Sequence, residues 1–74
     1  MSQKLLKDLL SEREQLVLKS IASGKTSQQI ATELYISKHT VDTHRRKMIQ
    51  KTEVQNTTAL VQRAYLEGLF ENSL

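Results

Sequence analysis

Basic and hydrogen-bonding side chains are concentrated between positions 38 and 51 of this sequence. This stretch contains five basic side chains and one carboxylate, so its local charge is +4. The remainder of the chain has six basic and seven acidic residues, and the whole chain carries +3. The charged residues of the stretch are Lys38, Asp42, Arg45, Arg46, Lys47 and Lys51. Positive charge gathered in this way is typical of a domain that binds a polyanion, although a solvated basic helix face is the plainer alternative.

Three side chains in this stretch have the chemistry to recognise base edges. Arg46 can donate two hydrogen bonds to O6 and N7 of guanine, and Asp42 can accept one from N4 of cytosine. The methyl and hydroxyl groups of Thr43 suit a thymine methyl group or a base edge. We therefore expect Asp42, Thr43 and Arg46 to contact bases.

A second set of side chains suits the phosphate oxygens of a nucleic-acid backbone. Lysine ammonium groups and short hydroxyls bind phosphate without reading sequence, and a helix N-terminus favours anions nearby. The expected phosphate contacts are Thr26, Ser27, Lys38, Thr40, Lys47 and Lys51.

Catalytic and metal chemistry find little support in the sequence. His39 and His44 are five positions apart, about 140° around a helix, so they cannot bind one metal ion together. Ser37, Asp42 and His44 on one helix make no plausible catalytic triad. There is no cysteine and no glycine-rich phosphate loop, and 74 residues give only a thin core. We expect no enzyme activity, no cofactor and no metal site.

The chain reads as helices that begin at capping residues. Ser11 and Thr26 each precede Glu or Gln by three positions, which is the capping-box pattern. Ser37 and Asn56 are further N-cap candidates. Apolar residues recur at helical spacing after each cap, so we predict an all-α fold with four helices, over residues 12–23, 27–35, 38–52 and 56–67.

The second and third predicted helices are about three residues apart, which is the spacing of a helix-turn-helix unit. Ala31 is small where the two helices must cross closely, while Tyr35 occupies a turn position where glycine is common. A helical wheel of residues 38–52 places Met48 and Thr52 on the side of Val41, facing inward. It places His39, Thr43, Arg46 and Gln50 on the opposite side.

The run LSEREQLVLKSIASGKTSQQIATELYISKHTVDTH, from Leu10 to His44, resembles the LuxR-type helix-turn-helix domain. This family includes output domains of bacterial response regulators and quorum-sensing regulators. The resemblance extends to about Phe70. It implies a four-helix domain that binds DNA as a symmetric dimer, with base contacts at Asp42, Thr43 and Arg46.

Four positions depart from the pattern of the family, among them Thr52, where leucine is common. Many members have a basic residue where this chain has Asp42, so the preferred DNA sequence is not inherited. Many have leucine at the position of Arg45, whose aliphatic stem we expect at the core edge with its guanidinium reaching a phosphate. Glu53 stands where glycine is common, and we expect it to adopt a positive φ.

The resemblance also gives expectations for assembly and organisation. Helix four often forms the dimer contact in this family, and here its expected interface residues are Ala59, Gln62 and Tyr65. We divide the chain into an N-terminal extension or linker stub (1–9), the DNA-binding domain (10–70) and a tail (71–74). The expected setting is the bacterial cytoplasm, because no apolar run is long enough to span a membrane.

Two rival interpretations remain. The domain could be a protein-interaction module that docks on RNA polymerase or on another regulator. Region four of a sigma factor has a similar helix order and a basic recognition helix, but the Thr40-Val41-x-x-His44 pattern favours the LuxR type. RNA polymerase is therefore a candidate partner beside double-stranded DNA.

Overall fold

The computed structural model describes residues 4–70, and every regular element in that range is a helix. The helices are α1 (Leu6–Leu9), α2 (Glu12–Ala22), α3 (Ser27–Leu34), α4 (Lys38–Thr52) and α5 (Thr57–Leu66). The all-α prediction is confirmed, and the four predicted helices correspond to α2–α5 to within one residue at each end. The short α1 is an addition to the predicted four.

Side-chain caps set where the four longer helices begin. The capping boxes at Ser11 and Thr26 are both complete. Ser37 Oγ accepts from the Thr40 N–H at 3.0 Å, and Asn56 Oδ1 accepts from the Ala59 N–H at 2.8 Å. Each cap satisfies a backbone donor that the first helical turn leaves without a partner.

Two helices end on non-glycine residues in the left-handed region. Tyr35 has φ 58° after α3, and Glu53 has φ 57° after α4, as expected for Glu53. Tyr35 reverses the chain so that the Ile36 N–H donates to the Ala31 carbonyl at 3.0 Å. The helix-turn-helix turn therefore forms without glycine, at a conformational cost that other contacts must offset.

The core is apolar and is shared by all five helices. Its fully buried large side chains are Leu6, Val17, Leu18, Ile30, Val41, Met48 and Leu60. Leu69 and Phe70 pack against this cluster. The expected tail at residues 71–74 lies outside the described residues.

Helix α1 lies within the segment that the sequence suggested was an extension, yet it takes part in the core. The Leu6 side chain is fully buried, and Leu10 is 5% exposed. The Leu6 N–H donates to Oε1 of Glu67, at the end of α5, at 2.7 Å. Residues 4–10 thus pack with the body of the domain.

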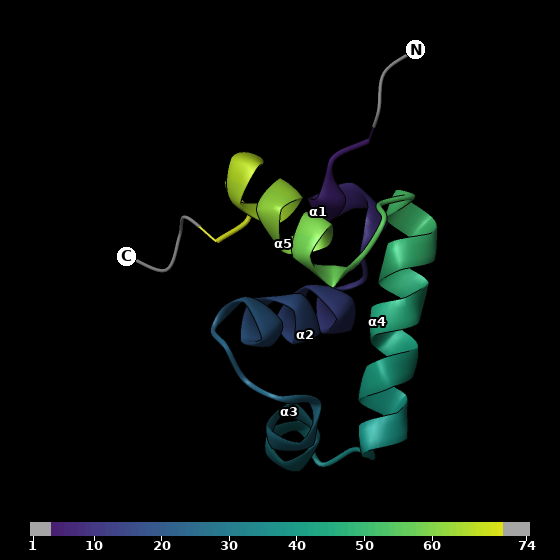
Figure 1. The fold of residues 1–74 in the computed structure, drawn as a ribbon, viewed down its shortest axis with the longest axis vertical. Coiled ribbons are helices and arrows are strands. Elements are labelled where there is room, and N and C mark those ends of the chain that lie inside the picture. The colour runs from purple at the N-terminus through teal and green to yellow at the C-terminus, as the bar shows by residue number, and fades with distance from the viewer. Residues whose placement is uncertain (1–3, 71–74) are drawn as a thin grey trace.

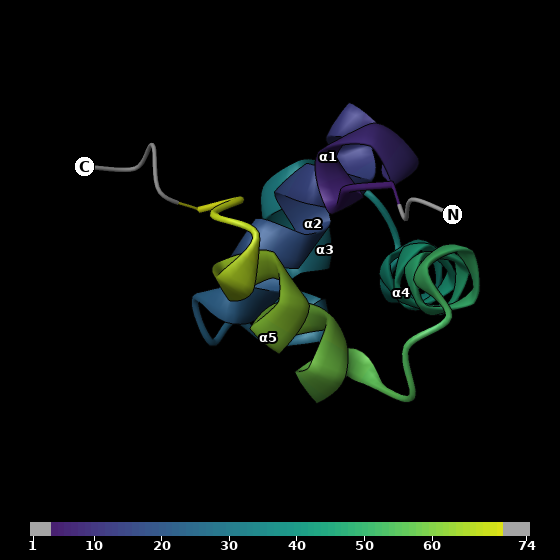
Figure 2. The same ribbon diagram turned by 90° about the horizontal axis from the view of Figure 1, so that it is seen from above.

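Helix α4 lies along one side of the molecule (Figure 1). Helix α3 is near its N-terminal end, and α1 and α5 are near its C-terminal end. Viewed from above, α4 is seen along its axis, at the edge of the helical body (Figure 2). One flank of a long polar helix is therefore turned away from the rest of the domain.

Candidate nucleic-acid interface

The inner side of α4 is the one that the helical wheel predicted. Val41, Met48 and Thr52 are buried. The Thr52 hydroxyl donates to the Met48 carbonyl at 2.7 Å, so this buried polar group is hydrogen-bonded within the apolar core. This packing fixes which side of α4 faces outward.

The outer side of α4 presents polar side chains to solvent. His39, Arg46, Lys47 and Gln50 are exposed, and Thr43 is half-buried. Within residues 4–70, neither Arg46 nor Lys47 takes part in an ion pair. Two cations are thus available to an external anion or base edge.

Four of the expected DNA-contacting residues meet where the start of α3 approaches α4. Asp42 Oδ2 lies 3.2 Å from Lys38 Nζ, and Asp42 Oδ1 lies 3.1 Å from Ser27 Oγ. Arg45 Nη2 donates to the same Ser27 Oγ at 2.8 Å. Hydrogen bonds from Lys38 and Ser27 hold the pKa of Asp42 below its ordinary value. We call Ser27, Lys38, Asp42 and Arg45 the α3–α4 cluster.

Thr26 and Thr40, which were expected at phosphates, both lie at helix starts. Thr26 is exposed, and its Oγ1 accepts from the Gln29 N–H at 3.1 Å as the α3 cap. Thr40 is half-buried, with its Oγ1 2.9 Å from Ser37 Oγ. The Thr26 hydroxyl hydrogen stays available to an external acceptor while its oxygen caps the helix.

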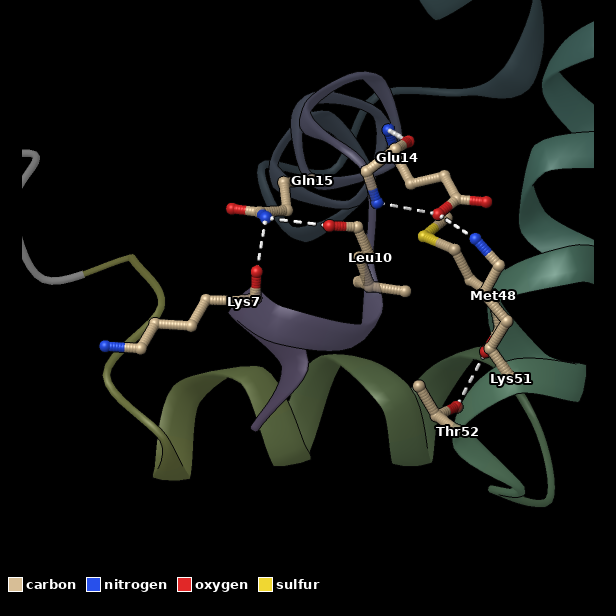
Figure 3. A network of polar contacts seen from close by, with 8 residues as sticks. Lys7, Leu10, Glu14, Gln15, Met48, Lys51 and Thr52 are labelled. Carbon is tan, nitrogen blue, oxygen red and sulfur yellow. Dashed lines mark hydrogen bonds and ion pairs between the residues drawn. The ribbon is translucent and has the colours of Figure 1, made fainter. Parts of the chain in front are cut away.

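Lys51, another expected phosphate contact, makes an ion pair with α2. Its Nζ lies 2.7 Å from Oε1 of Glu14 (Figure 3). The Glu14 side chain is only 5% exposed, and Oε1 also accepts from the Ser11 N–H at 2.9 Å. Burial alone would raise the pKa of Glu14, but the hydrogen bonds from Lys51 and Ser11 outweigh it and lower that pKa.

The sequence marked Glu14 only as the partner in a capping box. Its second role, as the buried acceptor for Lys51, joins residues 37 positions apart and leaves no local signal. Beside it, Gln15 Nε2 donates to the carbonyls of Lys7 and Leu10, at 3.2 and 3.1 Å (Figure 3). This corner therefore ties α1, α2 and α4 together.

Helix α5 presents an apolar surface to solvent. Tyr65 is 60% exposed and Leu66 is 88% exposed, while Gln62 is exposed and Ala59 is half-buried. The Tyr65 ring packs edge-on against Phe70, with ring centroids 4.9 Å apart. The expected interface residues Ala59, Gln62 and Tyr65 thus reach the surface to different degrees. Leu66, beside Tyr65, was not among the expected interface residues.

Two other kinds of site find no support in residues 4–70. No three His, Cys, Asp or Glu residues in this range gather closely enough to hold a metal ion. None of its helices combines the length and apolar character needed to cross a membrane.

Comparison with known proteins connects this geometry to a family. Residues 8–64 match the family described as bacterial regulatory proteins, luxR family. The chain is 38% identical over 60 residues to the uncharacterized response regulatory protein YgeK of Escherichia coli K12. It is 38% identical over 66 residues to the response regulator protein VraR of Staphylococcus aureus Mu3. These matches cover 81% and 89% of this chain.

A solved structure shares the fold. The crystal structure of Escherichia coli SdiA matches 93% of this chain with a TM-score of 0.81 and 36% sequence identity. The chain spans 41% of YgeK, 32% of VraR and 28% of the SdiA chain, so it corresponds to one part of these longer proteins. It belongs to the luxR family of bacterial regulatory proteins and is a DNA-binding helix-turn-helix domain rather than an enzyme.

Proposed function

We propose that this domain regulates transcription by binding double-stranded DNA sequence-specifically, with α4 in the major groove. The observation that carries the proposal is the outward polar flank of α4, with Arg46, Lys47 and Gln50 exposed over a helix packed by Val41 and Met48. At ~1.5 Å per residue the helix is about 22 Å long. The major groove is wide enough to admit an α-helix, so α4 can lie in it.

Base recognition is assigned to three residues of α4. Arg46 is the leading candidate, because its guanidinium is exposed and can bind guanine bidentately. Thr43 lies beside it on the same flank, half-buried. Asp42 lies at the edge of that flank, where its carboxylate accepts hydrogen bonds from Ser27 and Lys38.

Phosphate contacts fall into two groups according to their existing partners. Lys47 and Thr26 are exposed donors, and Lys38 is in an exposed ion pair with Asp42, which a phosphate can displace at little cost. Thr40 belongs with these at the start of α4. By contrast, Ser27, Arg45 and Lys51 are engaged within the protein, so we expect weaker phosphate contacts from them.

Two copies pair through α5 in this proposal. Exposed positions 58, 62, 65 and 66 form one stripe on the helix, flanked by Ala59, and Tyr65 and Leu66 supply its apolar area. Pairing would place two α4 helices about 34 Å apart, one turn of DNA. Because a monomer this small binds DNA weakly, pairing would set occupancy. The setting we propose is the bacterial cytoplasm, with RNA polymerase as a further partner.

The test is selection of a binding site from randomised duplex DNA, followed by affinity measurements at several salt concentrations. The logarithm of affinity should fall linearly with the logarithm of salt, by about 0.9 per neutralised phosphate. Arg46→Ala should lose about 1–3 kcal/mol of binding free energy, through relaxed preference at one base pair. Lys47→Ala should lower the salt slope by about one, and Lys51→Ala by less. Lys19→Ala, an exposed lysine of α2 beside Leu69 and Phe70, is the matched control and should change neither.

Two results would count against this function. No sequence selected by a covalently dimerised chain at ~50 mM salt would favour the protein-interaction module instead. An Arg46→Ala variant with unchanged sequence preference would remove the base-contact assignment. Pairing is tested separately by sedimentation with DNA, where Leu66→Glu should give one bound copy in place of two.

A further inference from the structure

The Ser27 hydroxyl lies between a cation and a carboxylate, and this fixes the direction of its hydrogen bonds. Arg45 Nη2 is 2.8 Å away and can only donate. Asp42 Oδ1 is 3.1 Å away, and an ionised carboxylate can only accept. The Ser27 oxygen therefore accepts from Arg45, and its one hydrogen goes to Asp42.

This direction leaves Ser27 poorly suited to a phosphate. A phosphate oxygen needs a donor, and the only side-chain donor of Ser27 is already used inside the protein. Arg45 is also held, because its Nη2 donates to Ser27, while its buried Nε has no hydrogen-bond partner within residues 4–70. The α3–α4 cluster is built as an internal support.

The group that this support holds is the Asp42 carboxylate. Ser27 donates to Oδ1, Lys38 pairs with Oδ2 in the free protein, and the side chain remains 35% exposed. Each oxygen keeps a lone pair for a further donor. On the helical wheel Asp42 is only about 40° from Arg46, so it borders the flank assigned to the major groove. A carboxylate there repels phosphate but accepts from the amino group of cytosine.

Arg45 would disturb this carboxylate if nothing stood between them. Its positive charge already acts on Asp42 across the cluster. The Ser27 oxygen takes up the Arg45 donor and passes its own hydrogen to Asp42, so the two charged groups are bridged and not directly paired. Without the hydroxyl, the guanidinium would be free to pair directly with the carboxylate and to change its orientation.

We propose that Ser27 is a positioning residue for base recognition, which holds the Asp42 carboxylate where it accepts the N4 amino hydrogen of one cytosine in the major groove. This inference rests on the proposed function, because it requires sequence-specific binding by α4. It assigns Ser27 to specificity and not to backbone contact.

The experiment uses the sites selected by the native chain. The base pair read by Asp42 is the one whose preference disappears in Asp42→Ala. Affinity is then measured for all four bases at that position. The native chain should favour cytosine by about tenfold, within the range of one specific base contact. Ser27→Ala should reduce this ratio to below about threefold and leave other positions unchanged.

Three further variants sharpen the test. Ser27→Thr keeps a hydroxyl and should retain the cytosine preference. Asp42→Asn should move the preference to adenine, the base that an amide recognises. Thr32→Ala removes an exposed hydroxyl from the same helix and should have no effect. Since Thr26 is the α3 cap, Ser27→Ala should fold, which thermal unfolding checks.

The outcomes separate this inference from the proposed function. A native chain that selects no DNA sequence refutes the proposed function itself. A native chain that selects a sequence, but in which Ser27→Ala keeps the cytosine preference or weakens all sequences equally, overturns only the role of Ser27. Asp42→Ala with no change at any base pair overturns it as well.

Discussion

Lys51 Nζ in the last turn of α4 lies 2.7 Å from Oε1 of Glu14 in the first turn of α2, and the glutamate is buried. The same carboxylate closes the Ser11 capping box. One buried group therefore caps the start of a core helix and anchors the C-terminal end of α4. Removal of this carboxylate should weaken both the start of α2 and the attachment of α4.

Replacing Glu14 with glutamine should lower the free energy of unfolding by about 1–2 kcal/mol, because the ion pair is lost while an amide oxygen can still cap α2. Lys51 is 42% exposed and can turn to water, which limits the loss. Urea unfolding measures it. The matched control is Glu33→Gln, which breaks the exposed Lys25–Glu33 pair and should change stability by less than about 0.5 kcal/mol. Equal effects of the two variants would contradict the anchoring role.

Stability should fall on acidification. Burial of Glu67 raises its pKa, but hydrogen bonds from the Leu6 N–H and Arg63 outweigh this and lower it from 4.5, and the pKa of Glu14 is lowered likewise. A lowered folded-state pKa adds stability above the ordinary value, which is lost as pH falls through the folded-state value. Urea midpoints should therefore be flat with respect to these groups above about pH 5.5 and should drop below about pH 4.5. Glu67→Gln should flatten the drop. Stability that increased below about pH 4.5 would contradict the carboxylate contacts.

Leu6 should count as a core residue despite its place near the start of the chain. Leu6→Ala should cost about 2–5 kcal/mol, because the side chain is fully buried and the site would be left partly empty. The neighbouring Leu5 is 45% exposed, so Leu5→Ala should cost less than about 1 kcal/mol. Thermal unfolding compares the two. Similar small losses would mean that α1 is a dispensable extension.

The two left-handed helix ends should be improved by glycine. Tyr35→Gly and Glu53→Gly should each raise the free energy of unfolding by about 0.5–1 kcal/mol, since glycine adopts φ near 57–58° without strain but adds entropy to the unfolded chain. Gly24→Ala is the reverse control. Gly24 has φ 92°, and a Cβ atom at this position would meet only open space, so backbone strain alone should destabilise that variant. A destabilised Tyr35→Gly variant would show that the exposed ring has a stabilising contact.

The N-terminal boundaries of the helices were predictable because their signals are local. Ser11, Thr26, Ser37 and Asn56 each act within three residues of their own position, and the 3.6-residue period of α4 placed Val41 and Met48 inward. Local patterns of this kind can be read directly from a sequence.

The partners of the charged residues were not predictable in this way. Lys51 and Arg45 suited phosphate by type, but their positions against Glu14 and Ser27 depend on how α4 crosses α2 and α3. The packing of helix α1 in the core was not predictable for a related reason. This helix has four residues and no side-chain cap, and its polar contacts come from Gln15, eight positions from Lys7, and from Glu67, 61 positions from Leu6.

Arg45 and Lys51 are six residues apart on α4, about 9 Å along its axis, and each is held by a different neighbouring helix. Two separated attachment points resist rolling and tilting of the helix more than one central contact would. Under the proposed function, any change that shifted α2 against α3 would thus turn Arg46 toward a different base edge. Mutations at Glu14, which lies outside the proposed interface, would then alter which operators the protein prefers, and this gives evolution a route to new operators that leaves the proposed base-contacting residues in place.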